Sequence, residues 1–343
     1  RVRESAIGLG YRVPFIVASP WSRGGYVNSQ VFDHTSVVQF IEGFASRKAK
    51  KQVVCENVTD WRRAVCGNLD SVFRPYNGEE IKEPTYLKRN EYVQRIDKAQ
   101  YKPLPIVADA LSEENIKQIR ENPLVVKTYL QQENGGRKSN SLPYELGVDL
   151  QKVGNTLKIN FEAATKLFGK KSAGSPFVVY ALKDYKKKSD FEKGANWNFT
   201  VGAGDKISYD WKIDNFSDKK YQLAVHGPNG FYRLFEGDGG CPTIDIIATN
   251  IKNKKRTYGS LELRFLNKEN RALDISIIDN AYGKSILKKN ISANSSSAID
   301  ISLESSFGWY DFIVLVDGYS SYKSIYAGHV ENGHEAMSDP QIG

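Results

Sequence analysis

The stretches YQLAVHGPNGFYRLFEG at residues 221–237 and DFIVLVDGYSSYKSIYAG at residues 311–328 decide the fold of this chain. Each reads as two runs of strand-forming residues around a Gly-containing turn, which is the pattern of two neighbouring antiparallel strands. Similar residues recur at one constant offset of 91: Leu223/Val314, Val225/Val316, Gly227/Gly318, Phe231/Tyr322, Phe235/Tyr326 and Gly237/Gly328. The shared offset predicts that the chain contains the same unit twice.

The correspondence extends upstream of both stretches. LKINF at 157–161 matches LELRF at 261–265, and residues 177–185 correspond to 273–282. Short alternating runs continue from residue 142 onwards, with Gly, Asn, Asp and Ser between them. We therefore predict a mostly β chain with two tandem antiparallel β-sandwich domains, at 140–238 and 242–331.

Residues 1–75 have a different sequence pattern from the β region. The apolar run VPFIVA at 13–18 predicts a buried strand of an α/β sheet, and TSVVQFIEGFA at 35–45 predicts a helix with Thr35 or Ser36 as its N-cap. A second helix is expected from Thr59 to about Phe73. One strand and two helices do not make a domain, so we interpret this region as the C-terminal end of an α/β domain.

Residues 76–139 form an expected connector, because charges increase and prolines interrupt the apolar periodicity. A helix is predicted at SEENIKQIREN, residues 112–122, with Ser112 as its cap. GGRKSNS at 135–141 is typical of an exposed flexible loop.

Composition narrows the class of protein. The 343 residues carry a formal charge of +8, and the longest apolar runs are strand-sized rather than the roughly 18–20 residues of a membrane span. The first residue is Arg1, which favours a piece of a longer polypeptide or a processed product. Of three cysteines, Cys55 and Cys66 are either a disulfide or two reduced buried thiols, and Cys241 has no fourth cysteine to pair with.

Five segments in order carry a resemblance to a known family. They are GLGYRVPFIVASPWSRGGYVNSQVFDHTSVVQFIE, NVTDWRRAVCGNLDSVF, SLPYELGVDL, LAVHGPNGFYRLFEGD and FGWYDFIVLVDG. Together they resemble the bacterial phosphocholine-preferring phospholipase C family, which includes acid phosphatases and belongs to the alkaline-phosphatase-like superfamily. In that family an α/β phosphoesterase domain precedes two β-sandwich domains, which agrees with the repeat.

The resemblance implies a parent enzyme that is a phosphoric diester hydrolase, with a divalent metal of unknown identity and a hydroxyl nucleophile. The family's nucleophile and most of its metal ligands have no counterpart here, so we expect this chain alone to be inactive and to bind no metal. By the resemblance, the segment FDHTS places Asp33 and His34 close to the catalytic site of the parent enzyme. Arg23 is a candidate for binding the substrate phosphate.

Each candidate also has a structural interpretation. Asp33 and His34 alternatively cap and brace the helix that follows them, and Arg23 is alternatively a solvated loop residue. His329 and His334 lie near Glu331 and Glu335, although their spacing matches no compact metal signature. The aromatic residues of the β region form either the sandwich core or a platform for choline or sugar: Trp197, Trp211, Phe231, Tyr232, Trp309 and Tyr310.

Lysine-rich clusters occur at 47–51, 183–188 and 252–256. They are either solvated faces or sites of weak attraction to an anionic lipid surface, and no aromatic-interleaved motif indicates nucleic acid. We therefore expect the C-terminal part of a secreted or periplasmic phospholipase C that cleaves phosphatidylcholine-type lipids to diacylglycerol and phosphocholine. The alternatives are a non-catalytic β-sandwich module that binds lipid or glycan, or part of an acid phosphatase.

Overall fold

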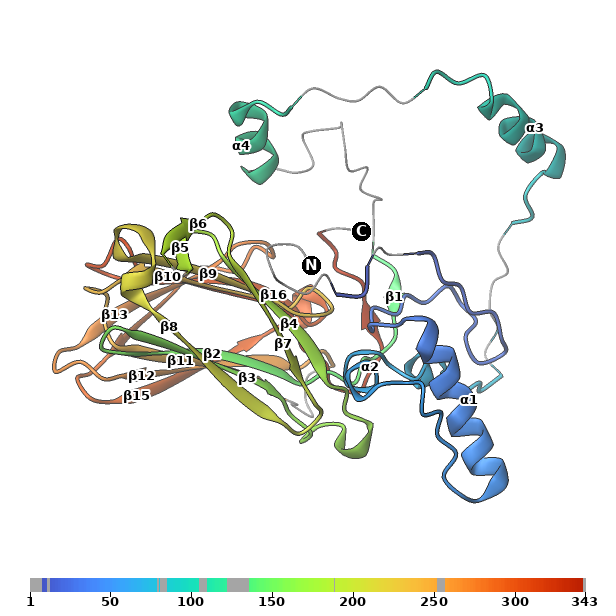
Figure 1. Ribbon diagram of the computed structural model, residues 1–343, viewed down its shortest axis with the longest axis horizontal. Coiled ribbons are helices and arrows are strands. Elements are labelled where there is room, and N and C mark those ends of the chain that lie inside the picture. Colours follow the sequence, from blue (N-terminus) through green and yellow to red (C-terminus); the bar gives the residue numbers. More distant parts are fainter. Residues whose placement is uncertain are drawn as a thin grey trace.

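The computed structural model describes residues 8–10, 13–78, 80, 85–104, 110–121, 136–187, 189–251 and 257–341. Antiparallel strands dominate it, so the prediction of a mostly β chain is confirmed. Figure 1 shows these strands stacked in two layers beside a smaller helical part. No helix among the described residues is long and apolar enough to cross a membrane.

The first half of the β region contains strands that run from residue 146 to residue 238. They are β2 (Leu146–Val153), β3 (Thr156–Ala163), β4 (Ser175–Ala181), β5 (Tyr185–Lys187), β6 (Asp190–Glu192), β7 (Asn196–Val201), β8 (Lys206–Lys212), β9 (Lys220–His226) and β10 (Tyr232–Asp238). Here β2, β3 and β8 form one small sheet, while β7, β4, β9 and β10 follow one another in a larger sheet.

The second half repeats the order of the first. It contains β11 (Ile244–Ile251), β12 (Ser260–Asn267), β13 (Leu273–Asp279), β14 (Leu287–Ile291), β15 (Ser296–Ser302), β16 (Trp309–Val316) and β17 (Lys323–His329). The strands β11, β12 and β15 form a small sheet, and β14, β13, β16 and β17 lie in the larger one. Only the β5–β6 hairpin lacks a counterpart among the described strands.

The two halves join edge to edge between β10 and β17, which makes one eight-stranded sheet. Leu234 lies directly opposite Ile325, the residue at an offset of 91 from it. Arg233 lies opposite Tyr326, and the rings of Phe235 and Tyr326 are 6.3 Å apart. The residues that the sequence matched as equivalents therefore meet at this junction.

A single hydrophobic core lies between the two layers and contains side chains from both halves. The largest fully buried apolar side chains include Trp211, Phe161 and Phe177 from the first half and Phe265 and Phe312 from the second. Alternation produces this core, because every second residue of β3, for example, is buried. The two halves consequently share one interior as well as one sheet.

The helical part contains α1 (His34–Ala49), α2 (Asp60–Val65) and the short 3-10 helix η1 (Asp70–Val72). The expected second helix to Phe73 is therefore too long, because the chain leaves helical geometry at Cys66 and Leu69 adopts a positive φ. The expected strand at 13–18 is also wrong. Phe15 is 56% exposed and Ile16 is 88% exposed, and no strand of the described chain pairs with them.

The connector carries α3 (Arg89–Ala99), which the sequence interpretation missed, and α4 (Glu113–Glu121). Ser112 Oγ accepts a hydrogen bond from the Asn115 N–H at 3.1 Å, so the predicted cap of α4 is confirmed. Figure 1 shows both helices extending away from the β region.

The segment that was expected to be a flexible loop, residues 135–141, contains a strand instead. There β1 (Lys138–Ser139) pairs with β18 (Ala336–Met337), and Ser139 also forms a parallel bridge with Val27. Three distant parts of the sequence thus pair their backbones at one place, which local turn chemistry could not reveal.

Candidate functional site

The carboxylate of Asp33 caps α1. Its Oδ1 accepts hydrogen bonds from the Thr35 N–H at 2.8 Å and from the Thr35 hydroxyl at 2.6 Å. Ser36 Oγ accepts the Asp33 N–H at 3.1 Å and completes a capping box. The expected N-cap at Thr35 or Ser36 is therefore wrong, because the extended backbone of Asp33 places its carboxylate over the free N–H groups of the first turn.

The other carboxylate oxygen of Asp33 forms an ion pair with Arg62 of α2. The neighbouring Trp61 donates from Nε1 to Thr200 Oγ1 of β7 at 2.9 Å. Asp33 thus links α1 to α2, and α2 in turn contacts the β region. Both oxygens of Asp33 are engaged in holding these elements together.

A second carboxylate–guanidinium pair joins the same two helices, with Glu42 on α1 and Arg63 on α2. Arg63 donates to both oxygens of Glu42 at 2.7 and 2.8 Å, in the bidentate geometry that arginine favours. This hydrogen bonding lowers the pKa of Glu42 and raises that of Arg63, although partial burial opposes both shifts. The pair also holds Cys55, whose N–H donates to Glu42 and whose carbonyl accepts from Arg63.

All three cysteines are free thiols in the structure. Cys55 is partly buried, and Cys66 lies buried at the end of α2. Burial raises the pKa of the Cys66 thiol, and also that of Cys241, which therefore resist ionisation. Of the two alternatives for Cys55 and Cys66, the structure has the reduced pair.

His34 occupies the first position of α1 and is exposed. In the part of the chain that the structure describes, the His34 ring makes no hydrogen bond with Asp33, whose oxygens face Thr35 and Arg62. The two residues therefore do not form a histidine–carboxylate dyad. His34 remains a candidate because its imidazole is free to contact a molecule or a chain segment at the start of the helix.

Arg23 lies elsewhere in the same loop region. Its guanidinium carbon is 4.6 Å from the centre of the Tyr76 ring, and its carbonyl accepts from Arg74. Arg74 in turn lies over the Tyr26 ring at 3.5 Å. The structure therefore groups Arg23 with Arg74 and two tyrosines, and none of these contacts involves Asp33 or His34.

The residues of this region do not fit a metal site. Nowhere in the described ranges do three His, Cys, Asp or Glu side chains gather as they would around an ion. Asp33 is already saturated by the helix N-terminus and by Arg62. The divalent metal that the resemblance implies is accordingly not assigned to any residue of this chain.

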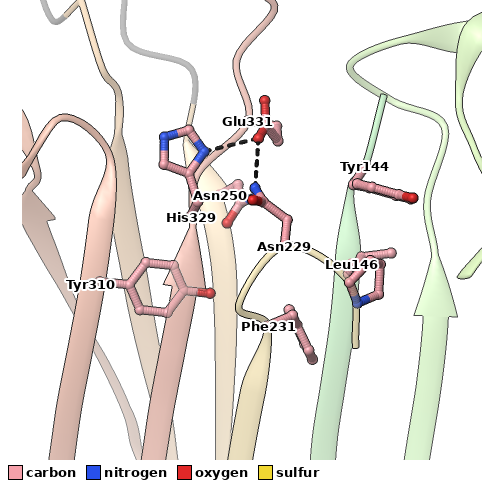
Figure 2. Close-up of a pocket in the computed structure, with 9 residues that line it drawn as sticks. Tyr144, Leu146, Asn229, Phe231, Asn250, Tyr310, His329 and Glu331 are labelled. Atoms are coloured by element: carbon pink, nitrogen blue, oxygen red, sulfur yellow. Dashed lines mark hydrogen bonds and ion pairs between the residues drawn. The ribbon is translucent and has the colours of Figure 1, made fainter. Parts of the chain in front are cut away.

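The C-terminal histidines and glutamates do not form one cluster. Glu335 pairs with Arg74 at 3.1 Å and accepts from the Tyr26 hydroxyl at 2.8 Å. His329 instead pairs with Glu331 at 2.9 Å in a small pocket at the end of β17. Figure 2 shows this pair, with the Asn229 amide reaching the same carboxylate.

Glu331 is the centre of this pocket. Its Oε1 accepts from Asn229 at 3.1 Å and faces His329 Nδ1, while Oε2 accepts the Leu142 N–H at 2.9 Å. His329 Nε2 lies 3.0 Å from the Phe307 carbonyl, which can only accept. Because both ring nitrogens face acceptors, this geometry favours the imidazolium form, in which both nitrogens can donate.

Electrostatics agree with this protonation state. Burial alone would lower the pKa of His329, but the Glu331 carboxylate and the Phe307 carbonyl outweigh it and raise the pKa above its ordinary value. The buried charges of His329 and Glu331 therefore compensate each other. Their arrangement suits holding chain segments together, since every oxygen and nitrogen already has a partner within the protein.

Sequence reasoning missed two elements of this region. Asn229 and Leu142 meet Glu331 over separations of 102 and 189 residues, which no local pattern indicates. The buried Arg233 donates to the Tyr310 hydroxyl at 3.0 Å and lies 4.1 Å from the centre of the Phe231 ring. The one sequence signal for the burial of Arg233 is its position within a predicted strand, between Tyr232 and Leu234.

Comparison with known families gives two matches. Residues 139–238 match the family model for the bacterial phospholipase C C-terminal domain, and residues 2–45 match the phosphoesterase family model. The first match covers the first half of the β region. The second ends inside α1, so it includes Arg23, Asp33 and His34.

Curated relatives align with the chain over almost its whole length. It is 33% identical to a non-hemolytic phospholipase C of Pseudomonas aeruginosa over 100% of the chain and 45% of the relative. It is 31% identical to a non-hemolytic phospholipase C of Burkholderia pseudomallei over 98% of the chain and 43% of the relative. A hemolytic phospholipase C of Pseudomonas aeruginosa is 29% identical, over 98% of the chain and 45% of the relative.

A loop–helix segment that matches the phosphoesterase family model, followed by an antiparallel β region, defines the class. Within it, the chain belongs with the bacterial phospholipases C, and it corresponds to their C-terminal part. It spans less than half of the length of these relatives. The resemblance inferred from the sequence is thereby confirmed.

Proposed function

We propose that this chain is the C-terminal part of a phospholipase C that hydrolyses phosphatidylcholine-type lipids to diacylglycerol and phosphocholine. The observation that carries the proposal is the alignment of the whole chain, helical part and β region alike, with three phospholipases C. Hydrolysis adds water across the bond between phosphorus and the diacylglycerol oxygen. The diacylglycerol leaves as an alcohol, and phosphocholine keeps the new oxygen.

In this proposal the nucleophile and the metal belong to sequence outside these 343 residues. The chain contributes the loop and the start of α1, where His34 faces outwards and Arg23 offers a cation. The Arg62–Asp33 pair and the Trp61–Thr200 hydrogen bond fix this part against the β region. Such fixation supports a role in positioning a phosphate-binding region on a rigid scaffold.

Activity assays test this proposal. The 343-residue chain is compared with the same chain joined to the N-terminal half of the Pseudomonas aeruginosa non-hemolytic relative, using p-nitrophenyl-phosphocholine as the substrate. We expect turnover by the joined protein only, because loss of a nucleophile costs many orders of magnitude. A folded joined protein without turnover would contradict the proposal.

We further propose that the two halves of the β region are tandem copies of one domain. The shared strand order and the pairing of equivalent residues Leu234 and Ile325 support this proposal. We also propose a secreted or periplasmic location, which would give such an enzyme access to phospholipid surfaces outside the cytoplasm. Fractionation of cells that express the full-length protein would test the location.

A second candidate function, binding of the β region to lipid, has its own supporting observation. Cationic and apolar side chains are exposed together on the β5–β6 hairpin. This role is compatible with the first, because an enzyme that cleaves lipids must reach a membrane surface.

A further inference from the structure

The β5–β6 hairpin is an addition to the shared plan of the two halves. It is a two-stranded sheet of its own, inserted between β4 and β7. The corresponding connection of the second half, residues 280–286, is described throughout and contains no strand. The second half forms its part of the core without such a hairpin. The hairpin of the first half is therefore not needed to build the core, which points to another role.

The inward face of the hairpin is firmly anchored. The Tyr185 ring is buried, with ring centres 5.0 Å from Trp197 and 4.9 Å from Phe216. The Tyr185 hydroxyl accepts from Asn215 Nδ2 at 3.2 Å. The hairpin is therefore held against the end of the sandwich, and its outward face has a fixed orientation.

The outward face exposes apolar and cationic side chains side by side. Lys186 and Phe191 are directly opposite each other in the ladder, and strand alternation directs both away from Tyr185. Phe191 is 53% exposed, and so is Leu182, which precedes the exposed Lys183 at the end of β4. We call Leu182, Lys183, Lys186 and Phe191 the rim patch.

Two of the three acidic residues between 183 and 193 have partners within the hairpin. Glu192 lies 3.8 Å from the Lys187 ammonium, and Asp190 accepts from the Ser189 hydroxyl at 3.0 Å. Residues 183–193 contain five lysines and three acidic residues, so the hairpin carries a net positive charge. This charge is complementary to a negatively charged surface.

We propose that the rim patch binds the surface of an anionic phospholipid bilayer, with Phe191 and Leu182 in the headgroup region and the two lysines near lipid phosphates. The choice of a phospholipid bilayer as the partner rests on the proposed function. Apolar side chains flanked by lysines are typical of interfacial membrane binding. An aliphatic residue such as Leu182 offers no flat face for stacking on a base, which disfavours single-stranded nucleic acid.

Vesicle sedimentation of the 343-residue chain tests the proposal. We expect it to bind vesicles of phosphatidylcholine mixed with phosphatidylglycerol more tightly than vesicles of phosphatidylcholine alone. Replacing both lysines by Lys183→Gln and Lys186→Gln should weaken binding about 25-fold, since one lysine near an anionic surface contributes about fivefold. Phe191→Ala should weaken it about tenfold.

Matched controls lie at the other end of β4. Lys170 and Lys171 are exposed lysines that precede β4, whereas the rim patch follows it. The pair Lys170→Gln and Lys171→Gln removes the same charge, and we expect vesicle binding to remain unchanged. Equal weakening by both lysine pairs, or no weakening by the rim variants, would overturn the proposal.

Two further measurements separate this inference from its alternatives. Binding to single-stranded DNA that is as tight as binding to vesicles, and equally sensitive to Phe191→Ala, would overturn it in favour of nucleic acid. In the joined enzyme, rim variants should leave turnover of soluble p-nitrophenyl-phosphocholine unchanged and slow hydrolysis of vesicle lipid. If the joined enzyme turns over neither substrate while rim variants still weaken vesicle binding, the proposed function is wrong. The proposal that the rim patch binds membranes is then still supported.

Discussion

The β region and residues 13–73 both contain many apolar side chains, but all of the largest fully buried ones lie in the β region. Residues 13–73 bury smaller ones, such as Val65 and Leu69. Phe161 and Phe177 are fully buried in the core that the two sandwich halves share. Phe15, Ile16 and Phe44 are instead exposed, in the loop before α1 and on α1 itself. The β region therefore completes its own core, whereas the helical part leaves apolar surface without a partner among the described residues.

This contrast agrees with the family matches. The phosphoesterase match ends at residue 45, inside the region that exposes large apolar side chains such as Phe15 and Phe44. The phospholipase C C-terminal match covers residues 139–238, inside the region with a complete core. Under the proposed function, residues 13–73 would pack against the rest of the phosphoesterase domain, and the β region would serve as their scaffold.

The largest stability effect should come from truncating the shared core. Phe161→Ala removes a ring that stacks on Phe199 at 4.6 Å and contacts Phe177 at 5.5 Å. We expect the free energy of unfolding to fall by about 3–5 kcal/mol, because both apolar burial and close packing are lost. Urea denaturation monitored by tryptophan fluorescence measures this change.

The same substitution in the other region is the matched control. Phe15→Ala should change the free energy of unfolding by less than about 0.5 kcal/mol, because that ring is mostly in solvent. A loss as large as that of Phe161→Ala would show that residues 13–18 have a buried partner and would break the comparison.

The His329–Glu331 pair should make stability depend on pH. The pKa of His329 is raised in the folded protein, so its contribution is fully present below the unfolded value of about 6.5. It should be lost as pH rises through the folded pKa, because the native state then releases its extra proton. Urea denaturation between about pH 6 and 9 should show this decline.

Glu331→Gln is the control for that decline. Without the carboxylate, burial dominates and His329 loses its reason to stay protonated. We expect this variant to be less stable at pH 6 and to lack the decline at higher pH. An unchanged pH dependence would show that another group is responsible.

A smaller effect is expected at the start of α1. Asp33→Ala should lower the free energy of unfolding by about 1 kcal/mol, since it removes the helix cap and the partner of Arg62. Asp33→Asn keeps a capping oxygen and should recover part of the loss. Thermal unfolding that ranks the two variants equally would show that the cap contributes nothing.

Much of the β region was predictable from the sequence, because alternation and turn residues are local signals. The offset of 91 identified residues that meet across β10 and β17, such as Phe235 and Tyr326. The same use of local signals gave a wrong prediction for the apolar run at 13–18, which is not a strand. A run of apolar residues becomes a strand only when neighbouring strands satisfy its backbone, and the described chain supplies none.

The candidate site was less predictable. The sequence suggested that Asp33 belongs near a site or caps a helix, and the structure shows the cap. It also placed His329, Glu331 and Glu335 in one possible cluster, but Glu335 faces Arg74 while Glu331 faces His329. These choices depend on contacts between segments far apart in the sequence, which spacing along the chain does not encode.

The smallest effect on stability is expected at His34, which is exposed and lies outside the capping network. In the joined enzyme, His34→Ala should leave the unfolding midpoint unchanged and reduce turnover if the imidazole lies close to the reacting phosphate. Steady-state kinetics across pH would report it. Unchanged kinetics would leave His34 with no role beyond the first turn of α1.

The most direct test of the account is the turnover of p-nitrophenyl-phosphocholine by the 343-residue chain, measured with divalent metal ions present and compared with the joined protein. We expect turnover by the joined protein and none by the chain, although the chain folds. Metal-dependent turnover by the chain itself would contradict it, because residues within these 343 would then have to supply the nucleophile and bind the metal.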